Sequence, residues 1–249
     1  MLQQTQAPRV VGPFERWVGA FPDPRSCARA GPAAALRAWE GLGYNRRALN
    51  LQRSAVVITD SHRGEVPSDR VALEALPGVG PYTARAVMAF AFGEHVGVVD
   101  TNVARVLSRA VSGRRLGQKE VQVLADRLVP PGHSWGYNQT LFDIGAMHCR
   151  ATNPDCPACP LRPVCAWVAG GRASPDPAER GRRQSRFVGS DRQGRGRLVG
   201  ALRQGPLALA ELATASGWAK DPQRAKRVAD GLASEGLASW APDGTLRLP

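Results

Sequence analysis

Residues 76–84 read LPGVGPYTA, and this stretch decides how the chain is expected to fold. Gly78 and Gly80 lie between two helical patterns, predicted at about 69–76 and 81–92. Glycine lets the backbone turn tightly and leaves its amides uncovered, and amides at a helix N-terminus attract a phosphate. The pattern is typical of a helix-hairpin-helix that contacts a nucleic-acid backbone. An ordinary turn between two helices has the same composition and remains open.

Helical periodicity continues on both sides of this turn, with no alternating pattern that would indicate strands before residue 168. We therefore predict a mainly α fold with one core domain over residues 1–168. The other helices are expected at about 11–20, 33–40, 46–61, 101–110, 118–128 and 134–148.

The composition changes after residue 168. Residues 169–194 are rich in Gly, Arg, Ser and Pro, which predicts a basic flexible linker. Residues 195–249 contain three helical patterns, with Asp221 and Pro222 as the N-cap and first residue of the third. A two-stranded hairpin around Pro242, Asp243 and Gly244 follows. This order predicts a small winged-helix-like domain, a fold that binds DNA or other proteins.

Four cysteines form the second distinctive pattern: Cys149, Cys156, Cys159 and Cys165, spaced C-x6-C-x2-C-x5-C. The N-terminal sequence MLQQTQAPRV has no apolar signal segment, so we expect a cytoplasmic protein whose thiols stay reduced. Zinc sites usually pair two C-x2-C units, and only one is present here. The spacing therefore favours a [4Fe–4S] cluster in loop 149–165, with zinc or free thiols as the alternatives. Cys27 stands apart and is expected to be a buried small residue.

Charge points to the same kind of partner as the glycine turn. The chain has 33 Lys and Arg against 21 Asp and Glu, a net charge of +12. This excess favours a polyanion, although a solvated basic surface is the plain alternative. No apolar run is long enough to span a membrane, so no membrane partner is expected.

Asp100 is the candidate catalytic carboxylate. It follows the apolar run GVV and opens an amphipathic helix, which predicts a helix N-cap. A capping carboxylate uses one oxygen and can present the other to a ligand, so the capping and catalytic roles are compatible.

Five segments together resemble the endonuclease III superfamily of DNA glycosylases, and within it the adenine glycosylases of the MutY type. They are MLQQTQ (1–6), WEGLGYNRRALNL (39–51), LPGVGPYTA (76–84), VVDTNVARVL (98–107) and YNQTLFDIGAMHC (137–149). The resemblance covers residues 1–168 and raises the expectation of a [4Fe–4S] cluster. It implies a helix-hairpin-helix glycosylase that acts as a monomer on double-stranded DNA, at the nucleoid in a bacterium.

The resemblance also implies the reaction: monofunctional hydrolysis that releases adenine mispaired with 8-oxoguanine or guanine after base flipping. Bifunctional relatives carry a lysine at the position of Tyr82, and tyrosine cannot form a Schiff base. The carried-over roles are as follows: Asp100 stabilises the sugar cation, Asn102 orients Asp100, Tyr82 lines the site, Gln139 reads adenine, Gln4 and Tyr44 fill the base stack, Thr5 and Leu42 lie near the lesion strand, and Gly78 and Gly80 contact phosphate.

Two departures qualify the resemblance. The glutamate that serves as the family's general acid lies two residues before the Leu of LQQT, which falls immediately upstream of Met1. Losing a general acid costs roughly 10²- to 10⁴-fold in rate, so we expect this 249-residue form to be poorly active. The 55 residues after the linker are also too few for the Nudix-like domain with which the family recognises 8-oxoguanine.

Two other functions remain open from the sequence. A thymine or uracil mismatch glycosylase shares the hairpin, the aspartate and the cysteines. A cluster-bearing DNA-binding protein without strong catalysis fits the missing acid and the winged tail. MLQQTQ and Gln139 favour adenine, and Asp100 favours an enzyme.

Overall fold

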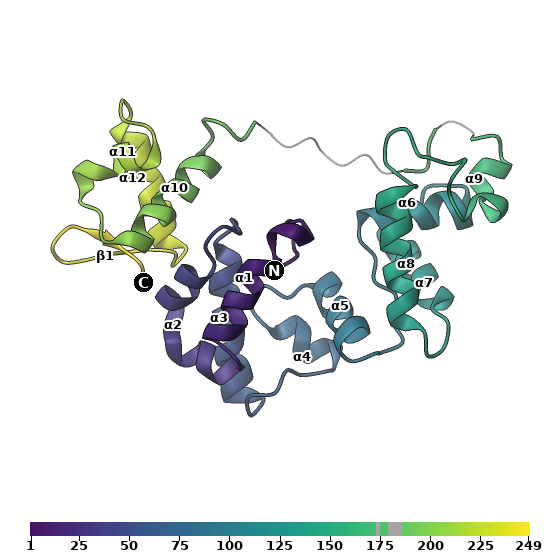
Figure 1. Cartoon of the computed structure of the whole chain (residues 1–249), viewed down its shortest axis with the longest axis horizontal. Helices are drawn as coiled ribbons and strands as arrows, with labels where there is room; N and C mark the ends of the chain where they lie inside the picture. Colours follow the sequence, from purple (N-terminus) through teal and green to yellow (C-terminus); the bar gives the residue numbers. More distant parts are fainter. Residues whose placement is uncertain (173–174, 179–185) are drawn as a thin grey trace. The chain divides into compact units, whose positions relative to one another are not determined.

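The computed structural model describes residues 1–172, 175–178 and 186–249, and nearly all of its regular structure is helical (Figure 1). The α-helices are α1 (Val11–Ala20), α2 (Pro24–Ala38), α3 (Arg46–Ser61), α4 (Arg70–Ala75), α5 (Pro81–Ala91), α6 (Thr101–Leu107), α7 (Gln118–Leu128), α8 (Ser134–Met147), α9 (Ala166–Ala169), α10 (Asp191–Gln204), α11 (Leu212–Ser216) and α12 (Pro222–Ser234). Strands β1 (Ser239–Trp240) and β2 (Leu246–Arg247) form an antiparallel pair. The predicted mainly α class is confirmed.

The chain divides into two compact units. The first contains residues 1–67, 76–78 and 184–249, and the second contains residues 68–75 and 79–183. This division differs from the predicted single core over 1–168, because the C-terminal helices share a hydrophobic cluster with α2 and α3. No described helix is long and apolar enough to cross a membrane.

Helix α2 begins well before the predicted start at residue 33. Asp23 caps it by accepting a hydrogen bond from the Ser26 amide at 2.6 Å, and Pro24 occupies the first turn. Gly31 and Pro32 interrupt the helix without ending it, because the left-handed backbone of Gly31 (φ 76°) bends the chain between two helical halves. The Gly-Pro pair, which usually ends a helix, hid the first half from sequence reasoning.

The C-terminal residues form the predicted three helices and hairpin. Leu207 also forms an isolated antiparallel bridge with Leu246 of β2. The predicted linker over 169–194 ends too late, since α10 starts at Asp191. The Asp191 carboxylate binds Arg224 and Arg227 of α12, which holds this first turn in place. Residues 173–174 and 179–185 of the predicted linker lie outside the described residues.

The second unit has its own core, formed mainly by α6, α7 and α8 (Figure 1). Its buried residues are Val103, Val106, Leu107, Ala110, Val121, Ala125, Leu141 and Ile144. Gly145 permits the close approach of α8 to α6, because a Cβ at this position would lie 2.8 Å from the Cβ of Asn102. The core therefore brings the C-terminal half of α8 against the turn that starts with Asp100.

Candidate functional site

Asp100 is the N-cap of α6, as its sequence context predicts. Its Oδ1 accepts a hydrogen bond from the Val103 amide at 2.7 Å. Its Oδ2 lies 3.4 Å from the side-chain Nδ2 of Asn102. The carboxylate is half-buried, so one oxygen is committed to the helix while the other faces an amide donor. This arrangement holds a negative charge in a fixed position at the start of a helix.

The backbone that leads into Asp100 is held by Asn138 of α8. Asn138 is fully buried, and its Oδ1 accepts from the Val98 amide at 2.8 Å. Its Nδ2 donates to the carbonyls of Val96 at 3.0 Å and of Ser134 at 2.8 Å. Sequence reasoning missed this residue, although it lies next to Gln139 in the YNQ triplet. A buried, fully hydrogen-bonded amide fixes the segment before Asp100 in one conformation.

Arg105 connects the Asp100 turn to the first cysteine. Its Nη2 donates to Asn102 Oδ1 at 2.7 Å and to the Gly145 carbonyl at 2.9 Å. Its Nε donates to the Cys149 carbonyl at 2.6 Å. The side chain is only 7% exposed, and this burial is the main cause that lowers the pKa of its guanidinium. Sequence reasoning missed Arg105; its only signal is its position three residues after Asn102 on the apolar face of the helix.

Tyr82 and Gln139 lie in the second compact unit, which also contains Asp100. Burial of the phenol, followed by the negative charge of Asp100, raises the pKa of Tyr82. Tyr82 lies in the first turn of α5. Gln139 lies on α8, where its Nε2 donates to Asp143 Oδ1 at 3.0 Å. The structure thus brings Asp100 and Asn102 together, with Tyr82 within reach of the Asp100 charge, whereas the Gln139 amide is engaged along its own helix.

The four predicted cysteines line one cavity in the second unit. Its other walls are mainly apolar and include Val106, Ile144, Leu161 and Trp167. Burial raises the pKa of Cys159, the Leu161 amide lowers it, and the other three cysteines raise it. Within the described part of the chain, no three His, Cys, Asp or Glu side chains are grouped to hold a single metal ion. The donor set is four thiols around a shared apolar cavity, which suits a sulfur-ligated iron cluster.

Arg109 covers one wall of this cavity and is only 1% exposed. Its Nη1 lies 3.5 Å from Cys149 Sγ and donates to the Arg150 carbonyl at 2.7 Å. Its Nε and Nη2 donate to the two carboxylate oxygens of Asp176 at 2.9 and 2.5 Å. Its guanidinium also stacks over Trp167, with 4.7 Å to the ring centroid. Arg109 therefore connects the start of the cysteine loop, at Arg150, to Asp176, which follows the loop in the sequence.

In the first unit, Arg47 joins two segments that the sequence marked as DNA contacts. Its Nη2 donates to Thr5 Oγ1 at 2.8 Å and to the Leu42 carbonyl at 3.2 Å. Its Nη1 donates to the carbonyls of Met1 and Gln3. One guanidinium therefore sets the segment 1–5 beside the loop 39–45. Arg47 was missed because a basic residue in a basic chain carries no distinguishing signal.

The predicted contact residues in these segments differ in exposure. Gln4 and Tyr44 are exposed and have left-handed backbones, with φ of 56° and 45°. Non-glycine residues in this region are uncommon and concentrate at functional sites. Leu42, by contrast, is buried in the hydrophobic cluster, so its side chain packs within the protein, and its place near the lesion strand stays a prediction. Leu42 is apolar and lies beside Trp39, and burial in the core is the outcome that hydrophobicity favours.

The two glycines of the hairpin have different reasons to be glycine. Gly78 has a φ of +78°, and a Cβ there would lie 2.5 Å from the Asn50 side chain, so the fold requires glycine. Gly80 has an ordinary φ of −99°, and a Cβ would meet nothing within 4 Å. Gly80 precedes Pro81 at the N-terminus of α5. The fold itself does not need glycine at position 80, which fits close approach by an external group.

Comparison with known proteins gives the family of this chain. Residues 1–131 match the model of the HhH-GPD superfamily base excision DNA repair proteins. The chain is 40% identical over 253 residues to the adenine DNA glycosylase of Mycolicibacterium smegmatis, covering 100% of this chain and 84% of that relative. It is 37% identical over 171 residues to the human adenine DNA glycosylase, covering 66% of this chain and 31% of the human protein.

Two solved structures resemble the fold. A thermostable thymine-DNA glycosylase superimposes with a TM-score of 0.64 and 30% identity, covering 68% of this chain and 80% of that one. A trapped covalent intermediate of endonuclease III with DNA superimposes with a TM-score of 0.60 and 28% identity, covering 69% and 82%.

Proposed function

The chain belongs to the adenine DNA glycosylases of the HhH-GPD superfamily of base excision DNA repair proteins, and we propose that it releases adenine mispaired with 8-oxoguanine or guanine. The substrate is duplex DNA, and the reaction hydrolyses the N-glycosidic bond. A base inside a duplex is inaccessible, so the adenine is extruded before its bond is broken. The endonuclease III structure that this fold resembles is a complex with DNA.

The geometry of Asp100 is the observation that supports this function best. As the glycosidic bond breaks, positive charge develops on the sugar, and a fixed carboxylate stabilises that charge. Oδ1 of Asp100 is held by the helix amide and Oδ2 faces Asn102, so the charge is oriented before substrate arrives. Preorganised charge of this kind lowers the barrier without reorganisation during the reaction.

Tyr82 supports hydrolysis over a lyase reaction. A lyase of this family needs an amine to attack the sugar, and the phenol of Tyr82 cannot form an imine. The negative charge of Asp100 contributes to raising the pKa of Tyr82, and a protonated phenol can donate a hydrogen bond. We assign it a place beside the extruded nucleotide.

The DNA contacts are proposed for two sets of residues. Gln4 and Tyr44 enter the base stack from the segments that Arg47 holds together, and Thr5 lies beside the lesion strand. Gly78 shapes the hairpin, and the open backbone at Gly80 receives a phosphate at the N-terminus of α5. Gln139 reads the extruded adenine after its amide leaves Asp143, since an amide pairs well with the edge of adenine.

Cys149, Cys156, Cys159 and Cys165 are proposed to bind a [4Fe–4S] cluster in their shared cavity. Hydrolysis requires no electron transfer, so the cluster would fix the loop 149–165. The test is iron and sulfide content per chain, with zinc measured in the same sample. A matched Cys156→Ser variant should lose iron and visible absorption, whereas Cys27→Ser should keep both. Zinc at one ion per chain would overturn the cluster assignment.

The substrate proposal is tested with a panel of duplexes under single-turnover conditions, followed by alkali to reveal base loss. Adenine opposite 8-oxoguanine or guanine should be released, whereas adenine opposite thymine should stay. Release of thymine or uracil from mispairs with guanine would favour the thymine-type reaction of the structural relative. Equal release by the wild-type chain and an Asp100→Asn variant would overturn the proposed role of Asp100.

A further inference from the structure

The loop between α2 and α3, residues 39–45, holds Tyr44 in a backbone conformation that tyrosine does not favour. Tyr44 is 51% exposed and left-handed, and Gly41 and Gly43 also have positive φ of 86° and 66°. An aromatic residue in this conformation is held there by its surroundings. Within the loop, Trp39 Nε1 donates to the Gly43 carbonyl at 2.9 Å, and from α3 Arg47 donates to the Leu42 carbonyl at 3.2 Å. Contacts from inside and from outside the loop therefore hold its conformation.

The C-terminal residues supply a second set through Arg203 of α10. Its Nε donates to the Leu36 carbonyl at 2.9 Å, and its Nη2 donates to Asn45 Oδ1 at 2.9 Å. Leu36 lies in the last turn of α2, where carbonyls lack partners within the helix and the helix end is negative. Asn45 is the residue just before α3. Arg203 thus bridges the two ends of the loop.

Asn45 directs its side chain to Arg203 and not to its own helix. It occupies the N-cap position of α3, where asparagine is among the favoured residues, yet its side chain makes no capping hydrogen bond. Its Oδ1 accepts from Arg203 instead. The Asn45 backbone is helical (φ −55°, ψ −23°) and not extended as in a capping residue, so its side-chain oxygen is left for Arg203, 158 residues away.

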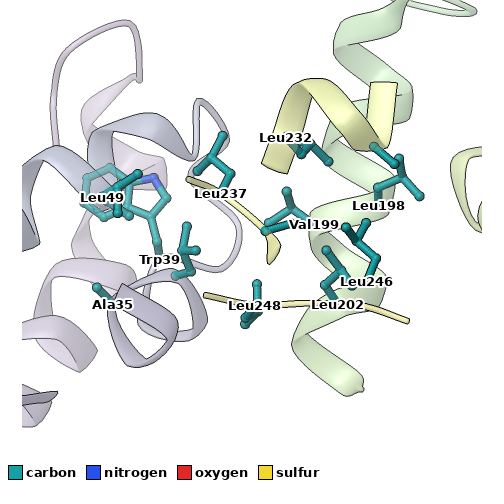
Figure 2. Packing of buried hydrophobic residues seen from close by; sticks show 14 of the residues in the cluster. Ala35, Trp39, Leu49, Leu198, Val199, Leu202, Leu232, Leu237, Leu246 and Leu248 are labelled. Atoms are coloured by element: carbon teal, nitrogen blue, oxygen red, sulfur yellow. The ribbon is translucent and has the colours of Figure 1, made fainter. Parts of the chain in front are cut away.

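A shared core keeps Arg203 in place. Leu198 and Leu202 of α10 belong to the same buried cluster as Trp39 and Leu49, and Figure 2 shows Leu237 in this cluster as well. Burial is the main cause that lowers the pKa of Arg203, and the charge of Glu40 acts in the opposite direction. The guanidinium is therefore held by packing on a continuous core and does not move freely in solvent.

The basic side chains of α12 are already paired within the C-terminal part. Arg224 and Arg227 bind Asp191, at 2.7 and 3.0 Å, and Lys226 binds Asp230 at 2.8 Å. In winged-helix proteins the corresponding helix reads DNA through such cations. Here these charges contribute to holding the C-terminal part together, which favours an internal role for it.

We propose that residues 191–249 act as a brace for the loop 39–45, and that Arg203 is the positioning residue through which they preset Tyr44 for insertion into the base stack. The inference rests on the proposed function, because presetting matters only if Tyr44 helps to extrude a base. A loop that is already in its inserting conformation binds more tightly, since less ordering is required on binding.

The test is a fluorescence titration of the full chain with a duplex that holds 2-aminopurine beside the mispaired adenine, because unstacking raises its emission. Arg203→Met keeps the length of the side chain and removes its hydrogen bonds. It should raise the half-saturating concentration about tenfold, as expected for one or two lost hydrogen bonds to a charged group. Arg197→Met is the matched control, since Arg197 is an exposed arginine on the same helix. It should titrate as the wild type does.

Asn45→Ala removes the hydrogen bond between Arg203 and Asn45 from the loop side and leaves α10 intact. If Arg203→Met lowers the midpoint of urea unfolding, Asn45→Ala is the variant that tests the brace. The double variant should be no worse than Arg203→Met alone, because the bond that Asn45→Ala removes is one of the two that Arg203→Met removes. The brace would be overturned if both single variants unstack the duplex at the wild-type concentration, or if their effects on the half-saturating concentration simply add in the double variant. It would also be overturned if the wild-type chain unstacks nothing. Unstacking without release of adenine would instead count against the proposed function and leave the brace standing.

Discussion

Arg105 donates a hydrogen bond from Nη2 to Oδ1 of Asn102 across 2.7 Å, and this bond decides which way the Asn102 amide faces. With Oδ1 engaged, Nδ2 is turned toward Oδ2 of Asp100 at 3.4 Å. The same guanidinium binds the Cys149 carbonyl at 2.6 Å. The orientation of the proposed catalytic carboxylate is therefore connected through two side chains to the first residue of the cysteine loop.

Arg105→Met should lower both stability and activity. Three hydrogen bonds are lost, and the buried Gly145 carbonyl loses the Arg105 donor, so the free energy of unfolding should fall by about 2–4 kcal/mol. Urea unfolding followed by circular dichroism measures this. Arg105→Lys keeps the charge but lacks the forked geometry, so it should lie between the wild type and Arg105→Met. Unchanged release of adenine by a folded Arg105→Met chain would show that Asn102 needs no orientation.

Asp100→Asn should separate catalysis from helix capping. Asparagine caps a helix about as well as aspartate, so stability should change by less than about 1 kcal/mol. The negative charge is lost, and single-turnover release of adenine should fall by at least about 100-fold. Asp221→Asn is the matched control, because Asp221 also caps a helix, accepting from the Arg224 amide at 3.0 Å. A control as slow as Asp100→Asn would point to a general effect of losing a capping charge.

Much of the fold was predictable because it depends on local signals. Helices α1, α3, α7 and α8 fall within a residue of their predicted ends, since periodicity and terminal residues agree there. The first half of α2 was missed because Gly31 and Pro32 read as a stop, although the helix continues past the bend. The start of α10 was missed because its stabilising partners, Arg224 and Arg227, are about 33 residues away.

The residues of the candidate site also fall into two groups, those that local sequence context indicated and those that it did not. Asp100 and the cysteines were found because each has a recognisable sequence context. Arg105 and Asn138 act through hydrogen bonds to residues about 40 positions away, and no local pattern marks such bonds. Leu42 was assigned to DNA by resemblance, but hydrophobic burial took its side chain into the core. Sequence reasoning thus proposed the catalytic carboxylate, Asp100, and missed Arg105 and Asn138, which hydrogen-bond around it.

The hairpin glycines should respond differently to alanine. Gly78→Ala adds a Cβ 2.5 Å from Asn50 and forces a positive φ on alanine, so stability should fall by about 1–3 kcal/mol. Gly80→Ala meets nothing within 4 Å and should unfold at nearly the wild-type urea concentration. If a phosphate approaches this backbone, Gly80→Ala should still bind duplex DNA several-fold more weakly in an anisotropy titration. Wild-type affinity of a folded Gly80→Ala chain would remove the phosphate contact from the proposal.

Cys27 should make stability depend on alkaline pH. It is 4% exposed, and burial raises the pKa of its thiol from the ordinary value of 9.0 to about 11. Between these values the unfolded chain loses the proton while the folded chain keeps it, so unfolding becomes easier as pH rises. The contribution is complete below pH 9 and is lost by about pH 11, and a shift of this size amounts to about 2–3 kcal/mol.

The measurement is the difference in unfolding free energy between the wild-type chain and Cys27→Ala across this pH range. Burial also raises the pKa of Tyr82 and Tyr137, but both chains contain these tyrosines, so their effect cancels in the difference. Cys27→Ala should cost a constant amount below pH 9 because it leaves a small cavity. Above pH 9 the difference in unfolding free energy between the wild type and Cys27→Ala should shrink. Parallel curves up to pH 11 would mean that the thiol ionises equally in both states and is not held in the apolar core between α2 and its neighbours.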